Sequence, residues 1–260
     1  MFKPNRVLGA ALVAFALLGS RTAHADTEKA VNLMVKPRVG HTTRSKSVVK
    51  MTVMGRDLVI TELEKDVVKE VKVNGDVVYE NIHEGGTVSA NGTETDQPAS
   101  PTRTKTYDKF GKLKDYKNED NSGFTTPEVS ALMESITTWI LTDKPVKTND
   151  TWETELENPV VKDKKVVVKS TYLGVEKVDG KDFWKLKQST EAASDAEGGK
   201  IVYDCTEWVD PANGDTFKFE GTVKNLPTQF GPLTIHITTQ ALKADAKNKA
   251  EAAKPIKNPN

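Results

Sequence analysis

Cysteine is almost missing from this chain, since Cys205 is the only one among 260 residues. A single cysteine cannot form a disulfide bond within the chain, so burial and hydrogen bonding must stabilise the fold. The chain is long enough to bury a sizeable core without crosslinks. Residues 203–208 alternate like a strand, and no general-base motif accompanies the thiol. We therefore expect Cys205 to be a half-buried strand residue rather than a nucleophile.

An excess of basic charge is also missing, because Lys and Arg together number 37 and Asp and Glu also number 37. The leader predicted below removes three bases and no acid, which leaves 34 bases against 37 acids, a net charge of −3. Phosphate recognition needs a basic surplus or stripe, so we expect no nucleic-acid partner. The same balance gives no reason to expect strong attraction to anionic lipid surfaces.

The motifs of catalysis and of cofactor or metal binding are absent too. The sequence contains no glycine-rich phosphate loop and no G-x-S-x-G nucleophile elbow. His83-Glu84 begins like a zinc-binding motif but lacks the second histidine, and His41 and His236 lie far away in sequence. We therefore predict a non-enzymatic protein with no catalytic residue, no cofactor and no metal site. A hydrolase whose groups meet only in space is the third hypothesis.

An uncharged apolar stretch occurs near the start of the chain. Lys3 and Arg6 precede the apolar run 7–19, and the small residues Ala23 and Ala25 follow it. This order predicts a secretory signal peptide over residues 1–25, cleaved after Ala25. Thirteen helical residues span about 20 Å, which is shorter than the hydrocarbon core of a bilayer. We expect an exported protein, periplasmic or secreted, that does not span a membrane.

Alternating apolar and polar residues follow the leader. Runs 48–53, 57–63 and 67–73 are rich in Val, Ile, Leu, Thr and Met, which favour strands. Asn74-Gly75 predicts a hairpin, because both residues tolerate positive φ. The segment 89–101 is rich in Thr, Ser, Asn, Gly and Pro, and it predicts a long exposed loop.

One segment has the pattern of an amphipathic helix. Thr126, Pro127 and Glu128 supply a hydroxyl cap, an early proline and an early acid, all typical of a helix start. Apolar residues then recur at helical spacing, and they predict a helix over residues 127–141. The residues that we expect to face an apolar ligand lie on this stripe or on its flank: Leu132, Met133, Ile136, Trp139 and Ile140.

The segments before and after this helix share a recurring pattern. An aromatic residue, then Asp, then a Gly turn recurs at 107–111 and at 208–214, each about 70 residues after a comparable opening. We interpret this as a duplication of a β unit, with halves at about 31–118 and 146–242. The predicted fold is mainly β (α+β), a duplicated antiparallel curved sheet or half-barrel wrapped around the helix.

In this reading, residues 26–242 form a single β-rich domain, and residues 243–260 form a disordered tail. Residues 143–152 and 210–214 resemble segments of the DUF6263-like group of uncharacterised secreted bacterial proteins. Asn149 stands where that group usually has glycine, a tolerable change because asparagine also adopts positive φ. The expected architecture also resembles that of LolA-like lipoprotein carriers, whose half-open barrel shelters acyl chains. That resemblance implies an apolar cavity.

Two main functional hypotheses follow. The first is an exported protein that binds a lipid or other apolar ligand between the curved sheet and the helix. The second is a structural or protein-interaction module of the cell envelope with a filled core. The sequence leaves the choice open, because Trp152, Trp184 and Trp208 would suit either a cavity wall or a packed interior.

Overall fold

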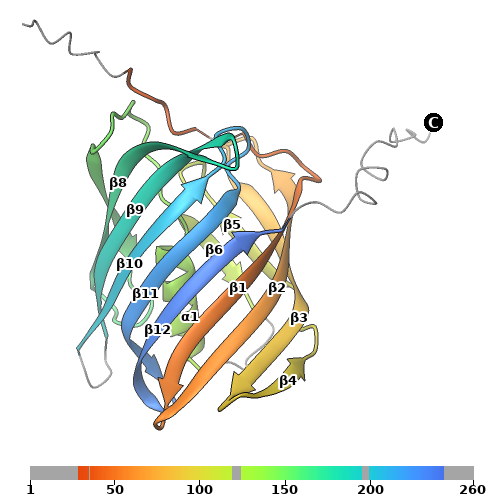
Figure 1. The fold of residues 1–260 in the computed structure, drawn as a ribbon. Coiled ribbons are helices and arrows are strands. Elements are labelled where there is room, and N and C mark those ends of the chain that lie inside the picture. The colour runs from red at the N-terminus through yellow and green to blue at the C-terminus, as the bar shows by residue number, and fades with distance from the viewer. Residues whose placement is uncertain (1–28, 35, 119–123, 195–198, 243–260) are drawn as a thin grey trace, which may run out of the picture.

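A computed structural model describes residues 29–34, 36–118, 124–194 and 199–242. The predicted signal peptide and the predicted C-terminal tail lie outside these residues. The described part contains twelve strands and one α-helix, and the helix lies on the concave side of a curved sheet (Figure 1). The predicted fold class, mainly β with a curved antiparallel sheet around one helix, is confirmed.

Six strands precede the helix and six follow it in the described chain. The first six are β1 (Thr42–Val53), β2 (Arg56–Val71), β3 (Val77–Ala90), β4 (Thr93–Gln97), β5 (Arg103–Tyr107) and β6 (Leu113–Lys117). The helix is α1 (Pro127–Thr137). The last six are β7 (Thr151–Glu157), β8 (Lys165–Val178), β9 (Lys181–Ala193), β10 (Lys200–Val209), β11 (Thr216–Thr228) and β12 (Gly231–Ala241).

The strands form one antiparallel sheet in the order β6-β5-β3-β2-β1-β12-β11-β10-β9-β8-β7, with β4 paired to β3. The first and last strands of the chain therefore meet in the middle of the sheet, and β6 and β7 are its two edges. The segment that contains α1 connects these edges. The predicted halves, 31–118 and 146–242, fall on the two sides of the β1–β12 pair, while their origin by duplication stays a prediction.

The helix is shorter than expected, because it ends at Thr137 rather than at residue 141. The side chains of Thr137 and Thr138 donate hydrogen bonds to the carbonyls of the preceding turn. The side chain of Gln188 then accepts from the backbone N–H of Ile140 at 2.7 Å and donates to the carbonyl of Thr138 at 3.0 Å. A side chain of the sheet thus takes the backbone groups that a longer helix would have used.

The predicted loop at 89–101 was partly wrong. Strand β3 continues to Ala90, and β4 pairs with it through a tight turn in which Asn91 and Gly92 have φ of 51° and 81°. The segment is polar because β4 is almost entirely exposed, not because it lacks structure. Runs 57–63 and 67–73 were expected as separate strands, but they lie mostly within the single long strand β2.

The β2–β3 pair contains a bulge, because Leu63 pairs with Gly85 and Glu64 pairs with His83, which leaves one extra residue on β3. Gly85, opposite this point, has φ of 109°, a conformation that other residues rarely adopt. A Cβ on Gly86 would lie 1.9 Å from the carbonyl oxygen of Thr61, so the close approach of the two strands requires glycine there. Bulges increase the local bend and twist of a sheet, and this one lies in the wall of the cavity described below.

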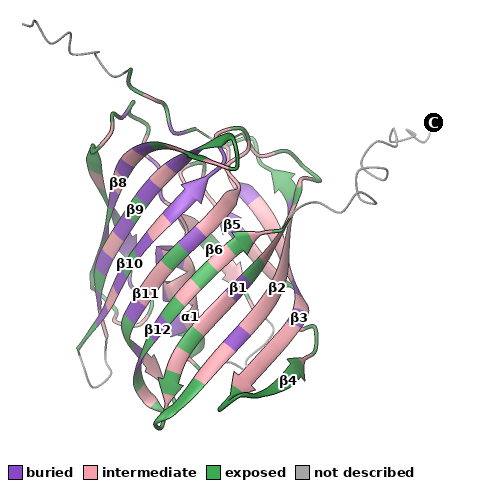
Figure 2. Cartoon of the chain, in the orientation of Figure 1, coloured by how far each residue is buried: buried purple, intermediate pink, exposed green. Residues whose placement is uncertain are grey.

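The buried core occupies mainly the β7–β12 side of the sheet. One cluster joins α1 to these strands through residues such as Leu132, Ile136, Val166, Ile201 and Tyr203. A second cluster packs Tyr172, Trp184 and Val209, among others, against the segments that flank the helix. Figure 2 shows the same asymmetry, with buried bands concentrated on β8, β9 and β10 and intermediate burial predominating on β1, β2 and β3.

Candidate functional site

A cavity of about 1260 Å³ lies on the concave side of the sheet. Its walls come mainly from β1, β2, β3, β5, β11 and β12 and from one face of α1, and β4, β6 and β10 contribute one residue each. The residues of α1 that line it are small, polar or flexible, among them Ala131, Met133, Glu134 and Thr137. The opposite face of the helix carries Leu132 and Ile136, both fully buried against β7–β12. The helix thus fills one side of the sheet and leaves space on the other.

The five predicted ligand-facing residues divide between these two faces. Leu132, Ile136 and Ile140 lie in the packed cluster with the strands of the second half. Met133 and Trp139 line the cavity, and each also packs against the edge of a buried cluster. The structure therefore brings only these two to the cavity wall. The most apolar stripe of an amphipathic helix packs into the core, and the flank of that stripe reaches the open space.

The register of the sheet divides the cavity into an apolar end and a polar end. Val49 on β1 lies opposite Ile60 on β2 and opposite Ile237 on β12. Two residues along each strand, Ser47 lies opposite Glu62 and opposite Thr239. All six residues line the cavity. Three neighbouring strands therefore change from apolar to polar side chains at the same level, which makes the cavity amphipathic.

The apolar end is continuous with the packed core. Val49, Met133 and Ile237 pack against the helix cluster, and Phe219, Leu226 and Ile235 belong to that cluster while also lining the cavity. Such a surface of branched, aromatic and thioether side chains suits a flexible hydrocarbon.

The polar end is crossed by an ion pair between the sheet and the helix. The ammonium of Lys105 on β5 lies 2.9 Å from a carboxylate oxygen of Glu134 on α1. The hydroxyl of Tyr107 donates a hydrogen bond to the same carboxylate. Burial lowers the pKa of Lys105, but the charges of Glu134, Tyr107, Asp66 and Glu64 together outweigh burial and hold that pKa above its ordinary value. Burial and Glu134 both raise the pKa of Tyr107.

Two carboxylates in the cavity wall titrate far from their ordinary range. Burial raises the pKa of Glu64 to about 7, although Lys105 lowers it. Burial raises the pKa of Glu207 to about 8, and a hydrogen bond from Thr216 opposes this rise. Near neutral pH the Glu207 side chain is therefore largely a neutral acid, able to donate a hydrogen bond as well as accept one.

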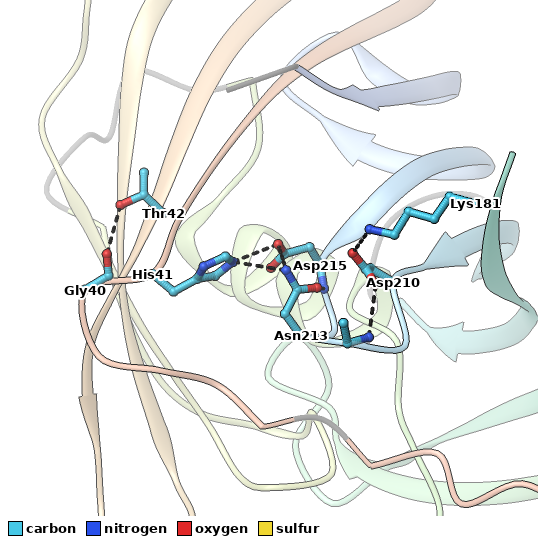
Figure 3. A network of polar contacts seen from close by, with 8 residues as sticks. Gly40, His41, Thr42, Lys181, Asp210, Asn213 and Asp215 are labelled. Atoms are coloured by element: carbon cyan, nitrogen blue, oxygen red, sulfur yellow. Dashed lines mark hydrogen bonds and ion pairs between the residues drawn. The ribbon is translucent and has the colours of Figure 1, made fainter. Parts of the chain in front are cut away.

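A polar network lies at the same end of the molecule (Figure 3). His41, just before β1, contacts the carboxylate of Asp215 at 2.7 Å, and the amide of Asn213 donates to that carboxylate. Lys181 pairs with Asp210 in the same turn between β10 and β11. Asp215 also lines the cavity, so the network joins the start of β1 to the turn between β10 and β11 beside the cavity.

The sequence reading missed the acidic wall of the cavity. Glu62, Glu64 and Asp66 occupy alternate positions of β2, on the same face as the buried Ile60 and Val68. Alternation could have revealed this row, because residues two apart share a face of a strand. Which face turns inward became clear only from the pairing of β2 with β1 and β3.

The tryptophans and the cysteine considered from the sequence lie away from the cavity wall, whereas His83 lines it. Trp152 and Trp184 pack in or against the second core cluster. Trp208 is buried under the ammonium groups of Lys185 and Lys218. Cys205 is a buried strand residue, and burial raises the pKa of its thiol to about 12, which makes it a poor nucleophile.

Within the described ranges, no group of three His, Cys, Asp or Glu side chains is arranged to hold a metal ion. The helix in the described part of the chain is not long or apolar enough to cross a membrane.

The comparisons with known proteins found similar solved structures but no match by sequence. No family matches the sequence, and no curated protein does. Among solved structures it is similar to the hypothetical lipoprotein YmcC from Escherichia coli K12, at 13% identity, with 76% of this chain and 85% of that chain covered and a TM-score of 0.24.

Two further structures are similar at the same level. One is a putative outer membrane lipoprotein-sorting protein domain from Vibrio parahaemolyticus, at 11% identity, with 82% of this chain and 90% of that chain covered and a TM-score of 0.23. The other is a DUF1329 family protein from Desulfovibrio piger, at 12% identity, with 80% and 87% covered and a TM-score of 0.25. Scores this low assign neither a family nor a function, and the resemblance to the DUF6263-like group stays a prediction.

Proposed function

We propose that this protein is a non-enzymatic, exported binding protein that holds a lipid-like ligand in the cavity between α1 and the β1–β3 side of the sheet. The observation that carries this proposal is the cavity of about 1260 Å³ with one apolar end. Small-molecule pockets usually measure about 300–1,000 Å³, so the space is ample for an acyl chain.

The position of the cavity separates this proposal from the filled-core alternative. A structural module would pack both sides of the sheet, and here the buried residues that pack with the helix come from β7–β12, with partly buried residues of β1 at the edge of the cluster. On the other side, Ser47, Glu62 and Glu64 stand at inward positions where a packed core would place apolar residues. The inward side chains on that side thus favour a ligand or water over protein.

The raised pKa of Glu64 is the observation that favours the hydrolase hypothesis. The described histidines offer it little support, because His41 contacts Asp215 and Asn213, and His236 contacts Thr222. His83 lines the cavity, but neither of its ring nitrogens has a hydrogen-bond partner among the described residues. Neither contact activates a serine or the cysteine. We therefore keep the binding protein as the proposed function.

The test is displacement of a fluorescent apolar probe, such as 1-N-phenylnaphthylamine, by fatty amphiphiles. The wild-type protein should take up the probe saturably. Ala131→Trp places an indole in the cavity, because Ala131 lines it from α1, and should reduce probe affinity at least tenfold. Lys144→Trp, at an exposed position outside the cavity, is the matched control and should bind as the wild type does.

Thermal unfolding of both variants checks that each is folded. Absence of saturable uptake by the wild-type protein would overturn the proposed function. Equal uptake by the folded Ala131→Trp variant would place the probe elsewhere and would also contradict the proposal.

A further inference from the structure

The polar end of the cavity contains more negative than positive charge. Glu62, Glu64 and Asp66 reach it from one strand. Arg103 approaches Glu64 at 3.7 Å, and Asp66 accepts a hydrogen bond from Asn81 at 2.9 Å. Among the described residues no ion pair reaches Glu62. Hydrogen bonds from a neutral amide do not cancel charge. In the described part of the chain, the one ion pair made by these three carboxylates is therefore that of Glu64 with Arg103.

Lys105 lowers the pKa of Glu64 but does not make up the difference, because its ammonium is engaged by Glu134 at 2.9 Å. The pair Lys105–Glu134 is neutral as a unit, and the row on β2 keeps a formal excess of two negative charges. Such an excess is costly in a partly buried site. Burial is the main cause that raises the pKa of Glu64, and the charges of Asp66 and Glu62 add to the rise.

A second observation points to a ligand at this place. His83 on β3 lies opposite Glu64 in the sheet, is only 6% exposed and lines the cavity, and neither ring nitrogen has a hydrogen-bond partner among the described residues. The side chains of Gln97, Ser100 and Arg103 each bring a further unpartnered buried atom to the cavity wall.

Buried polar atoms in folded proteins are nearly always hydrogen-bonded, and a cluster of exceptions calls for a specific explanation. Five such atoms, from four side chains on β3, β4, β5 and the β4–β5 connection, gather beside the acidic row. The set includes both donors, such as the Nε of Arg103, and acceptors, such as the Oε1 of Gln97. A polar group of a ligand would satisfy them.

We propose that the row Glu62, Glu64 and Asp66, together with His83, binds the ammonium head group of an amphiphile whose hydrocarbon chain lies in the apolar end of the cavity. An ammonium group carries three N–H donors and one positive charge, which matches a surplus of carboxylate acceptors. A carboxylate or phosphate head group alone would add to the charge that the site already has in excess. The inference rests on the proposed function and specifies its ligand.

The geometry of the sheet fits an amphiphile in this orientation. Ile60 at the apolar end and Glu64 in the acidic row are four residues apart on β2, which corresponds to about 13 Å along a strand. A medium-length alkyl chain can therefore reach the apolar wall while its head group stays beside the carboxylates.

The experiment compares amphiphiles with the same chain and different head groups. Dodecylamine, dodecanol and dodecanoate, at submicellar concentration and pH 7.5, compete with the fluorescent apolar probe. Dodecylamine should displace the probe at concentrations at least tenfold lower than dodecanoate, with dodecanol between them. Ethanolamine, an amine without the chain, should displace nothing. Displacement by ethanolamine as strong as by dodecylamine would identify a free amine as the ligand and would overturn the amphiphile part of the proposal.

Variants then tie the preference to the acidic row. Glu62→Gln/Glu64→Gln should lower the affinity for dodecylamine about tenfold and leave that for dodecanol unchanged. Glu70→Gln, exposed near the end of the same strand, is the matched control. Glu62→Gln alone should show part of the loss, and it serves if the double variant does not fold.

The possible outcomes separate this inference from the proposed function. Equal binding of all three amphiphiles, or a preference for dodecanoate, would overturn the head-group assignment while the cavity stays a ligand site. An unchanged preference in folded Glu62→Gln would overturn it as well. Binding of none of them, with no probe uptake, would overturn the proposed function itself.

Discussion

The helix α1 packs differently against the two sides of the sheet. Toward β7–β12, α1 presents Leu132 and Ile136 to strands whose inward side chains are mostly large and apolar, and both helix residues are fully buried. Toward β1–β5, it presents Ala131 and Glu134 to strands whose inward side chains are partly short or charged. One helix thus has a core on one side and a cavity on the other.

The difference teaches that a cavity can be specified by side-chain chemistry without a change of backbone architecture. Both sides belong to one antiparallel sheet and are joined at the β1–β12 pair. Carboxylates cannot be packed against an apolar helix without a large desolvation cost, so the wall that carries Glu62 and Glu64 stays apart from it. The contact with the helix on that side is polar, through Lys105 and Glu134.

The largest difference in stability between the two sides should appear when a side chain is removed from the packed side. Leu132→Ala should lower the free energy of unfolding by about 3–5 kcal/mol, because Leu132 is fully buried among strand residues that cannot collapse onto the gap. Met133→Ala, one residue along on the cavity side, should cost about 1 kcal/mol, because its side chain is only partly packed. Urea denaturation measures both. Equal losses would mean that the two sides are packed alike.

The ion pair across the cavity gives the next largest effect. Lys105→Met leaves the carboxylate of Glu134 buried without its cation and should cost about 3 kcal/mol. Lys105→Met/Glu134→Gln removes both charges and keeps an acceptor for the hydroxyl of Tyr107, so it should recover at least half of that loss. Urea denaturation of the two variants completes the comparison.

A surface pair provides the control for that measurement. Lys165 and Glu157 also form an ion pair, but their side chains are 51% and 85% exposed. Lys165→Met should therefore cost less than about 1 kcal/mol. A loss as small for Lys105→Met would show that the polar contact does not hold the helix on the cavity side.

Local chemistry predicted much of the fold. The hydroxyl cap of Thr126 and the proline at 127 placed the helix start correctly, and the side chain of Thr126 does accept from the backbone of Val129. Asn149 adopts φ of 72°, a conformation that asparagine tolerates better than most residues. These features depend on a few adjacent residues, which is why the sequence reveals them.

Long-range pairing determined what could not be predicted. The end of the helix depends on a hydrogen bond from Gln188 to Thr138, which is 50 residues away in the sequence. The sequence around Thr138 contains no signal that predicts this contact. The cavity depends on β1 lying beside β12, which aligns Val49 with Ile237 and Ser47 with Thr239. Each strand alone shows a change from apolar to polar residues, but only the register shows that the changes coincide. The acidic row was therefore visible in the sequence and could not be assigned to a site.

Glu207 lies at the boundary between the two sides, because it belongs to β10 of the packed side and also lines the cavity. Burial raises its pKa from 4.5 to about 8, so between these values the folded protein binds a proton that the unfolded chain has lost. Stability from this group is complete below pH 4.5 and falls as pH rises through that window, by about 1.4 kcal/mol per pH unit.

Glu207→Gln, which has no such proton, should abolish this dependence. From pH 5 to pH 6.5 the wild-type protein should lose about 2 kcal/mol of unfolding free energy relative to Glu207→Gln. Urea denaturation at both values, with the exposed Glu153→Gln as the control, isolates the contribution of this one carboxyl. A difference between wild type and Glu207→Gln that is constant with pH would mean that water reaches Glu207 from the cavity and solvates its charge. The boundary between the cavity and the packed core would then lie on the β9 side of β10.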